Sequence, residues 1–193
     1  MAEKSRIHDM EIKYDVVHRD VKYPRLEFKT GSLILVMPED NTDYSKIIEK
    51  HKNWIYAKRS IIKNALIEAE GKKYVDRSDD EFRELVYSCV ENICKELKLG
   101  VNKIFFRKMK SKWGSLSSKR NLTINILLKY LPDELVEYVI FHELTHLIER
   151  RHNEHFWRII AKNFKDYQEK EKDLLVYWFL IQQDVIEKSI EMA

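Results

Sequence analysis

The chain has 193 residues, of which 35% are charged and 44% apolar, and its formal net charge is +3. This length suits a single domain with a sizeable core, the apolar content excludes a disordered chain, and the small charge does not by itself indicate nucleic acid as a partner. No segment approaches the roughly 18 apolar residues of a membrane span, so we expect a cytoplasmic protein without membrane contact.

Short segments near the N-terminus alternate apolar and polar residues, as half-buried strands do: residues 12–17, 25–28 and 32–37. Gly31 lies between the last two and supplies the glycine that a tight hairpin turn needs. We therefore expect a small antiparallel sheet of two or three strands.

Helical periodicity follows the predicted sheet. Residues 44–70 indicate a long amphipathic helix, either continuous or broken near Arg59. Ser78 and Glu81 form a capping box that begins a second helix, and Gly100 is expected to end it. The only cysteines, Cys89 and Cys94, are five positions apart and thus on different helix faces, which favours buried thiols over a disulfide or a zinc site.

Two further strands are predicted at residues 103–109 and 122–127. The segment from Lys103 to Arg120 is rich in basic residues and contains no acidic one. A run of charge is commonly only a solvated face, and the alternative is a rim that attracts an anionic substrate or nucleic acid. The pattern leaves both interpretations open.

A helix beginning at Pro132 carries His142, Glu143 and His146. Residues four apart share a helix face, so the two imidazoles can bind one metal ion, and Glu143 can reach a water on that metal. This pattern also arises by chance, but here it lies in a strongly apolar helix, where unpartnered histidines would be costly. The pattern therefore favours a zinc-dependent hydrolase, in which Glu143 takes a proton from a zinc-bound water.

A catalytic zinc site commonly has three protein ligands, so a third residue is needed. The candidates are His152 and His155. If the motif helix ends near Arg150 and Asn153 caps the next helix, His152 falls in the turn between them and His155 in the first turn of the second helix. We therefore favour His152. A last amphipathic helix is predicted at about residues 170–190.

Four segments together resemble a known family: Trp113-Gly114-Ser115, Asn121 to Asn125, Tyr138 to His146, and His152 to Trp157. They are similar to the YgjP-like metal-dependent hydrolases, which are related to SprT-type zincins and to other zincin metallopeptidases. The resemblance implies an α+β, zincin-like fold with a small antiparallel N-terminal sheet. We expect one domain over residues 1–193. Its parts are a β meander (1–40), helices (41–100), a catalytic core (101–165) and a C-terminal helix (166–193).

The resemblance also implies roles for individual residues. Zn²⁺ would be bound by His142, His146 and His152, with Glu143 as the general base. The strand at 122–127 would pair with an extended substrate, and the candidate substrate-binding residues are Trp113, Gly114, Ser115 and Asn125, although tryptophan and glycine at a hairpin are often structural. Leu116 departs from the family, which commonly has cysteine there.

We expect a zinc metallopeptidase acting on a peptide or protein. One alternative is a metal-dependent nucleotide pyrophosphatase, for which the basic segment would attract a polyphosphate. Another is a nucleic-acid-associated zinc protein, or a protease of DNA-bound proteins as in the SprT-type enzymes, binding nucleic acid through residues Lys103 to Arg120. The sequence does not indicate an oligomeric state.

Overall fold

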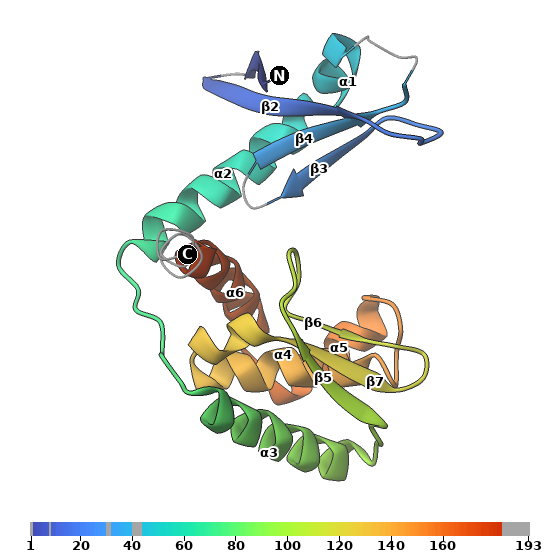
Figure 1. Ribbon diagram of the computed structural model, residues 1–193, viewed down its shortest axis with the longest axis vertical. Coiled ribbons are helices and arrows are strands. Elements are labelled where there is room, and N and C mark those ends of the chain that lie inside the picture. The colour runs from blue at the N-terminus through green and yellow to red at the C-terminus, as the bar shows by residue number, and fades with distance from the viewer. Residues whose placement is uncertain (1, 8, 30–31, 40–43, 183–193) are drawn as a thin grey trace. The chain divides into compact units, whose positions relative to one another are not determined.

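The computed structural model describes residues 2–7, 9–29, 32–39 and 44–182. Contacts between Cα atoms divide the chain into two compact units, residues 1–70 and 71–193, and each is described by itself. Both units contain helices and strands, which confirms the α+β class (Figure 1). Within the described ranges, none of the helices combines the length and apolar content that crossing a bilayer requires. The single-domain organisation stays a prediction.

The first unit contains a four-stranded sheet in the order β1-β2-β4-β3. Its strands are β1 (Ala2–Ile7), β2 (Met10–His18), β3 (Arg25–Lys29) and β4 (Ser32–Met37). The β1–β2 and β3–β4 pairs are antiparallel, as expected, whereas β2 and β4 are parallel. The expectation of a purely antiparallel sheet is therefore wrong. β4 is an almost continuous apolar run, which suits its inner position in the sheet, where both its edges are paired. The turn at Thr30 and Gly31 lies outside the described residues.

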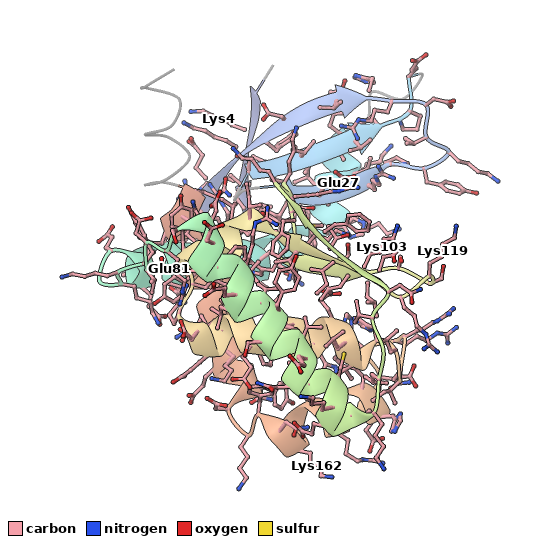
Figure 2. All side chains as sticks on the ribbon, turned by 60° about the horizontal axis from the view of Figure 1, so that its bottom comes forward. Lys4, Glu27, Glu81, Lys103, Lys119 and Lys162 are labelled. Atoms are coloured by element: carbon pink, nitrogen blue, oxygen red, sulfur yellow. The ribbon has the colours of Figure 1, made fainter. Side chains whose placement is uncertain are left out.

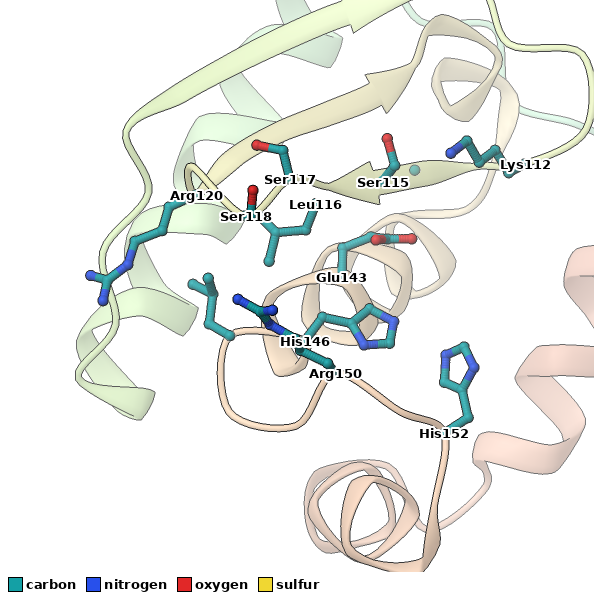
Figure 3. A pocket seen from close by; sticks show the side chains of 12 residues that line it. Lys112, Ser115, Leu116, Ser117, Ser118, Arg120, Glu143, His146, Arg150 and His152 are labelled. Carbon is teal, nitrogen blue, oxygen red and sulfur yellow. The ribbon is translucent and has the colours of Figure 1, made fainter.

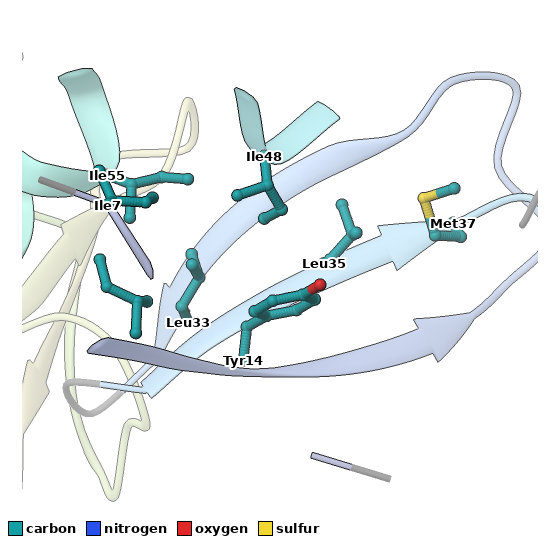
Figure 4. Close-up of a cluster of buried hydrophobic side chains, with 8 residues drawn as sticks. Ile7, Tyr14, Leu33, Leu35, Met37, Ile48 and Ile55 are labelled. Atoms are coloured by element: carbon teal, nitrogen blue, oxygen red, sulfur yellow. The ribbon is translucent and has the colours of Figure 1, made fainter. Parts of the chain in front are cut away.

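Two helices follow, α1 at Tyr44–Lys50 and α2 at Lys52–Ala69, so the chain breaks at His51 rather than near Arg59. Their apolar residues pack on one face of the sheet. Figure 4 shows Ile48 and Ile55 of these helices in the core cluster with strand residues that include Leu33, Leu35 and Met37. Burial of this face stabilises the first unit, because an isolated sheet cannot remove its apolar side chains from water.

The second unit begins with α3, at Asp79–Leu97. The capping box is present: Ser78 Oγ accepts from the Glu81 N–H, and the Glu81 carboxylate accepts from the Ser78 N–H at 2.8 Å. The helix ends before Gly100, because Lys98 adopts the left-handed conformation (φ 53°) and its N–H bonds back to the last turn. Cys89 and Cys94 are both free and partly buried in this helix.

A second sheet has three strands in the order β5-β7-β6. They are β5 (Lys103–Arg107), β6 (Gly114–Leu116) and β7 (Asn121–Asn125). β7 pairs with β5 in parallel and with β6 in antiparallel orientation. The predicted strand at 122–127 is therefore the central strand and ends at Asn125, where a 3₁₀ helix, η1 (Ile126–Tyr130), begins. Since both of its edges are paired, it is not available to a substrate, and that expectation is wrong. The edge strands are β5 and β6, and the sequence pattern did not reveal β6.

Three helices complete the unit: α4 at Asp133–Thr145, α5 at Glu154–Asn163 and α6 at Tyr167–Ile181. α4 is the central one, contacting α3, β6, α5 and α6, and eight of its residues are buried, which agrees with the predicted buried helix. It ends at Thr145 rather than near Arg150. The Thr145 hydroxyl bonds to the Phe141 carbonyl, and the next amides, of His146 and Leu147, bond three residues back, which tightens the chain into a turn. The predicted last helix is described through Ile181, and residues 183–190 lie outside the described residues.

Candidate metal centre and active site

Three histidines meet at the C-terminal end of α4. His142 is in the last turn of the helix, His146 is its C-terminal cap, and His152 lies in the turn before α5. One ring nitrogen from each lies within 4.8 Å of the others. The Nε2 atoms of His142 and His152 are 3.0 Å apart. The structure therefore brings together the three residues that the sequence pattern predicts as metal ligands.

This donor set fits zinc. Two imidazole nitrogens bound to one tetrahedral zinc ion are roughly 3.3 Å apart, since each Zn–N bond is about 2.0–2.1 Å. The 3.0 Å between the His142 and His152 nitrogens is close to that value. Burial lowers the pKa of His146 and of His152, and the neighbouring His142 lowers both further. These shifts favour the neutral imidazoles that a metal requires.

His155 is not part of this cluster. Its side chain is 56% exposed, and its Nδ1 atom lies 3.7 Å from Oε2 of Glu149. The reason is the local structure between α4 and α5: the Asn153 side chain accepts from the Phe156 N–H and caps α5, as predicted. This cap leaves His152 in the turn that faces the other two histidines and places His155 in the first turn of α5.

Two of the three imidazoles have a partner on the side away from the cluster. His146 Nδ1 lies 3.2 Å from the Glu149 carbonyl oxygen, and His142 Nδ1 lies 3.6 Å from Oε1 of Glu171 in α6. Glu171 also accepts a hydrogen bond of 2.6 Å from the Tyr138 hydroxyl. Burial opposes ionisation of Glu171, but the bonds from His142 and Tyr138 outweigh it and lower its pKa. Such contacts fix the orientation of an imidazole.

Sequence reasoning missed Glu171. It is one of many acidic residues in a charged helix, and no spacing relates it to the histidine motif. Only the packing of α6 against α4 brings it to His142, next to Tyr138. A sequence signal was therefore absent, and the contact depends on the tertiary structure.

Glu143 lies beside the histidines and faces β6. Gly114 packs directly on it, and the Leu116 N–H donates to its carboxylate. Burial raises the pKa of Glu143, and the charges of His142 and Lys112 oppose this shift. The carboxyl group is thus held in a sheltered position where it can exchange a proton with a reacting group.

A groove of about 640 Å³ runs between β6 and the end of α4 (Figure 3). Glu143, His146 and His152 lie in it, and its other lining residues are Lys112, Gly114, Ser115, Leu116, Ser117, Ser118, Arg120, Leu147 and Arg150. A smaller pocket of about 180 Å³ adjoins it on the side of His142 and Glu171, with Trp113, Val139 and Leu174 in its wall. The two cavities share Lys112, Gly114 and Glu143, so both open at the candidate active site.

The predicted substrate-binding residues have different surroundings. Ser115 lines the groove, Gly114 lines both cavities, and Trp113 lines the smaller pocket with its ring against that of Trp178. Asn125 is 0% exposed, and its amide donates to the carbonyl oxygens of Met109 and Lys112. These bonds anchor the loop before β6. A substrate contact of any of the four stays a prediction.

Part of the chain is similar to known metallopeptidases. The chain is similar to the metallopeptidase zymogen abylysin of Pyrococcus abyssi, with 24% identity over 47% of this chain and 91% of that chain and a TM-score of 0.44. It is also similar to the metallopeptidase zymogen jannalysin of Methanocaldococcus jannaschii, with 26% identity over 47% of this chain and 93% of that chain and a TM-score of 0.41. A search of curated proteins gives no match. The model of the YgjP-like metallopeptidase domain matches residues 68–176, more than half of the chain. The chain therefore belongs to the YgjP-like metallopeptidase domain family.

Proposed function

We propose that the chain is a zinc-dependent metallopeptidase, with His142, His146 and His152 as metal ligands. The observation that carries this proposal is the convergence of three ring nitrogens within 4.8 Å of one another, beside the half-buried side chain of Glu143. The donors are all imidazoles, which suit zinc. Membership of a metallopeptidase-domain family supports the same reaction class.

In this proposal the residues of the chain have distinct tasks. The chemistry that zinc supplies when bound is Lewis acidity, which activates water at neutral pH and polarises a scissile carbonyl. Glu143 accepts the proton of the attacking water on its carboxylate and passes it to the leaving amine. The Leu116 N–H holds that carboxylate in place. Glu171 orients the imidazole of His142 through its Nδ1 atom.

The edge of β6 is suited to an extended peptide. Two main-chain hydrogen bonds join this segment to β7. The Trp113 carbonyl oxygen accepts from the Asn125 N–H at 2.8 Å, and the Ser117 N–H donates to the Asn121 carbonyl oxygen at 3.0 Å. In an antiparallel ladder the alternate residues, Gly114 and Leu116, point their main-chain groups away from that partner. Both residues line the groove. Because the Leu116 N–H donates to Glu143, the Gly114 main chain and the Leu116 carbonyl oxygen are the groups that would pair with a substrate. We therefore assign substrate pairing to β6 in place of the 122–127 strand.

A second candidate is a nucleotide pyrophosphatase, because Lys112, Arg120 and Arg150 line the groove and would attract a polyphosphate. Binding of nucleic acid, or of DNA-bound proteins, stays a prediction. In the basic segment, Lys103 and Lys119 are exposed and do not line the groove (Figure 2). Their charges are therefore not part of the candidate active site.

The test is a comparison of wild type with Glu143→Gln on peptides, unfolded proteins and nucleoside triphosphates. We expect Glu143→Gln to retain zinc and to lose peptide hydrolysis by about 10²- to 10⁴-fold, the range of general-base catalysis. Glu137→Gln is the matched control, because Glu137 is an exposed acid of the same helix. Hydrolysis of triphosphates alone would select the second candidate. No hydrolysis that depends on Glu143 would exclude both.

A further inference from the structure

The groove has an uneven distribution of charge. Among the described residues that line it, one is acidic, Glu143, and three are Lys or Arg. Figure 3 shows Lys112 beside Ser115 on one side of Glu143 and His146, and Arg120 and Arg150 toward the opposite end. We propose that Arg120 and Arg150 form a subsite for acidic side chains of the substrate, so that the enzyme prefers peptides with Asp or Glu on one side of the scissile bond. This inference rests on the proposed peptidase function.

Both guanidinium groups are available to a ligand. Among the described residues, no carboxylate forms an ion pair with Arg120 or Arg150, whereas Arg77 pairs with Asp133 and Arg158 with Glu154. The acid nearest to Arg150 in the sequence, Glu149, is engaged elsewhere: its carboxylate accepts from the Arg151 N–H at 3.0 Å and faces His155. A guanidinium group can bind a carboxylate through two parallel hydrogen bonds. The subsite thus has the donors and, within the part of the chain that the structure describes, no carboxylate that competes for them.

The main chain at Arg120 is held firmly. Its N–H donates to the Ser117 carbonyl at 2.9 Å, and its carbonyl oxygen accepts from the Asn102 N–H at 2.9 Å. The Asn102 side chain also donates to the Lys119 carbonyl at 2.7 Å. Arg120 has a φ of 56°, in the region that glycine or asparagine adopts more readily. The turn therefore presents the base of this side chain at the rim of the groove in a fixed position, which reduces the entropy lost on binding.

The other lining residues favour a peptide over a nucleotide or nucleic acid. Of the described residues that line the groove, none is Phe, Tyr or Trp, and the aromatic rings among them are the imidazoles of His146 and His152. A nucleobase is usually held by stacking on such rings. The groove instead contains the edge of β6 and the side chains of Ser115, Ser117 and Ser118. These groups suit the main chain and polar side chains of an extended peptide.

The test measures binding without turnover, in the Glu143→Gln background loaded with zinc. The probes are two fluorescein-labelled peptides of equal length, one containing several Glu residues and the other Gln in their place. We expect the acidic peptide to bind about tenfold more tightly at low salt, and Arg120→Gln or Arg150→Gln to remove most of that preference. The matched controls are Lys119→Gln and Arg151→Gln, adjacent cations outside the groove lining, which should keep the preference.

Three results would overturn the subsite. The two peptides could bind equally, the preference could survive both groove variants, or the two control variants could reduce it as much. A single-stranded oligonucleotide of the same charge that binds more tightly, and loses its binding in the same two variants, would assign the arginines to phosphate instead. Failure of the proposed function is a separate result: wild type would cleave neither peptide, while the binding preference in Glu143→Gln would remain.

A second measurement locates the subsite relative to the scissile bond. Peptides with a single Glu moved along a neutral sequence are cleaved by wild type, and the products are identified by mass spectrometry. We expect kcat/KM to rise for Glu on one side of the cleaved bond only, because the two arginines lie toward one end of the groove. An equal rise on both sides, or none, would contradict the proposal.

Discussion

A Cβ atom at position 114 would lie 2.9 Å from Cγ of Glu143 and 3.3 Å from its Cδ. Gly114 therefore lets β6 pass directly over the acidic side chain of α4, closer than any other residue would allow. The same approach lets the Leu116 N–H reach the Glu143 carboxylate. Gly114 belongs to a segment that resembles the family, and its close contact with Glu143 gives a steric reason for a glycine at this position.

Replacing this glycine should disturb Glu143 more than the metal site. In Gly114→Ala the added methyl group must displace β6 or the carboxylate, and a shift of about 1 Å in a reacting group can cost on the order of 100-fold in rate. We expect Glu143-dependent peptide hydrolysis to fall about 10- to 100-fold while bound zinc is retained. Steady-state kinetics and elemental analysis measure the two effects.

Gly100→Ala is the control for that experiment, because a Cβ atom there meets nothing within 4 Å. It should leave both hydrolysis and zinc content unchanged. Equal activities for Gly114→Ala and Gly100→Ala would show that the close approach to Glu143 has no role in catalysis.

The three histidines can be tested by metal content. We expect about one zinc per chain, and loss of most of it in His142→Ala, His146→Ala and His152→Ala, because each removes one of three ligands. His155→Ala should retain the metal, since its exposed ring faces Glu149. Zinc retained by His152→Ala and lost by His155→Ala would reverse the assignment of the third ligand.

Glu171 should act through His142. Removing the partner of a metal-binding imidazole typically lowers metal affinity by about 10- to 100-fold. We expect Glu171→Gln to weaken zinc binding by this amount and Tyr138→Phe to weaken it less, measured by competition with a chelator. Glu169→Gln, an exposed acid of the same helix, is the control. An unchanged zinc affinity in Glu171→Gln would leave its contact with His142 without a function.

Cys89 should be a poorly reactive thiol. Burial, together with the charges of Glu137 and Asp133, raises its pKa from 9.0 to about 11. The reactive thiolate then forms only at higher pH, so at pH 8 alkylation should be about 100-fold slower than for an unperturbed thiol. Mass spectrometry of a Cys94→Ser variant treated with iodoacetamide measures this rate, with the denatured protein as reference. Folded and denatured rates that differ by less than threefold would contradict the shift.

Local patterns in the sequence predicted several elements correctly. The capping box of Ser78 and Glu81 begins α3, and the buried face of α4 carries His142 and His146. The Asn153 cap also predicted which histidine would lie in the turn before α5. Each of these features depends on residues a few positions apart, whose interactions form within one helix or one turn.

The features that were missed depend on residues far apart in the chain. The parallel pairing of β2 with β4, the edge position of β6 and the contact of Glu171 with His142 all join distant segments. The same holds for Arg120 and Arg150, which are unremarkable basic residues in the sequence but line one groove in the structure. Short-range patterns therefore predicted that these helices exist, two of their caps and the three histidines that meet, but not where the first predicted helix breaks or where α4 ends. The strand edge and the charges that surround the histidines depend on long-range packing, which the sequence pattern does not reveal.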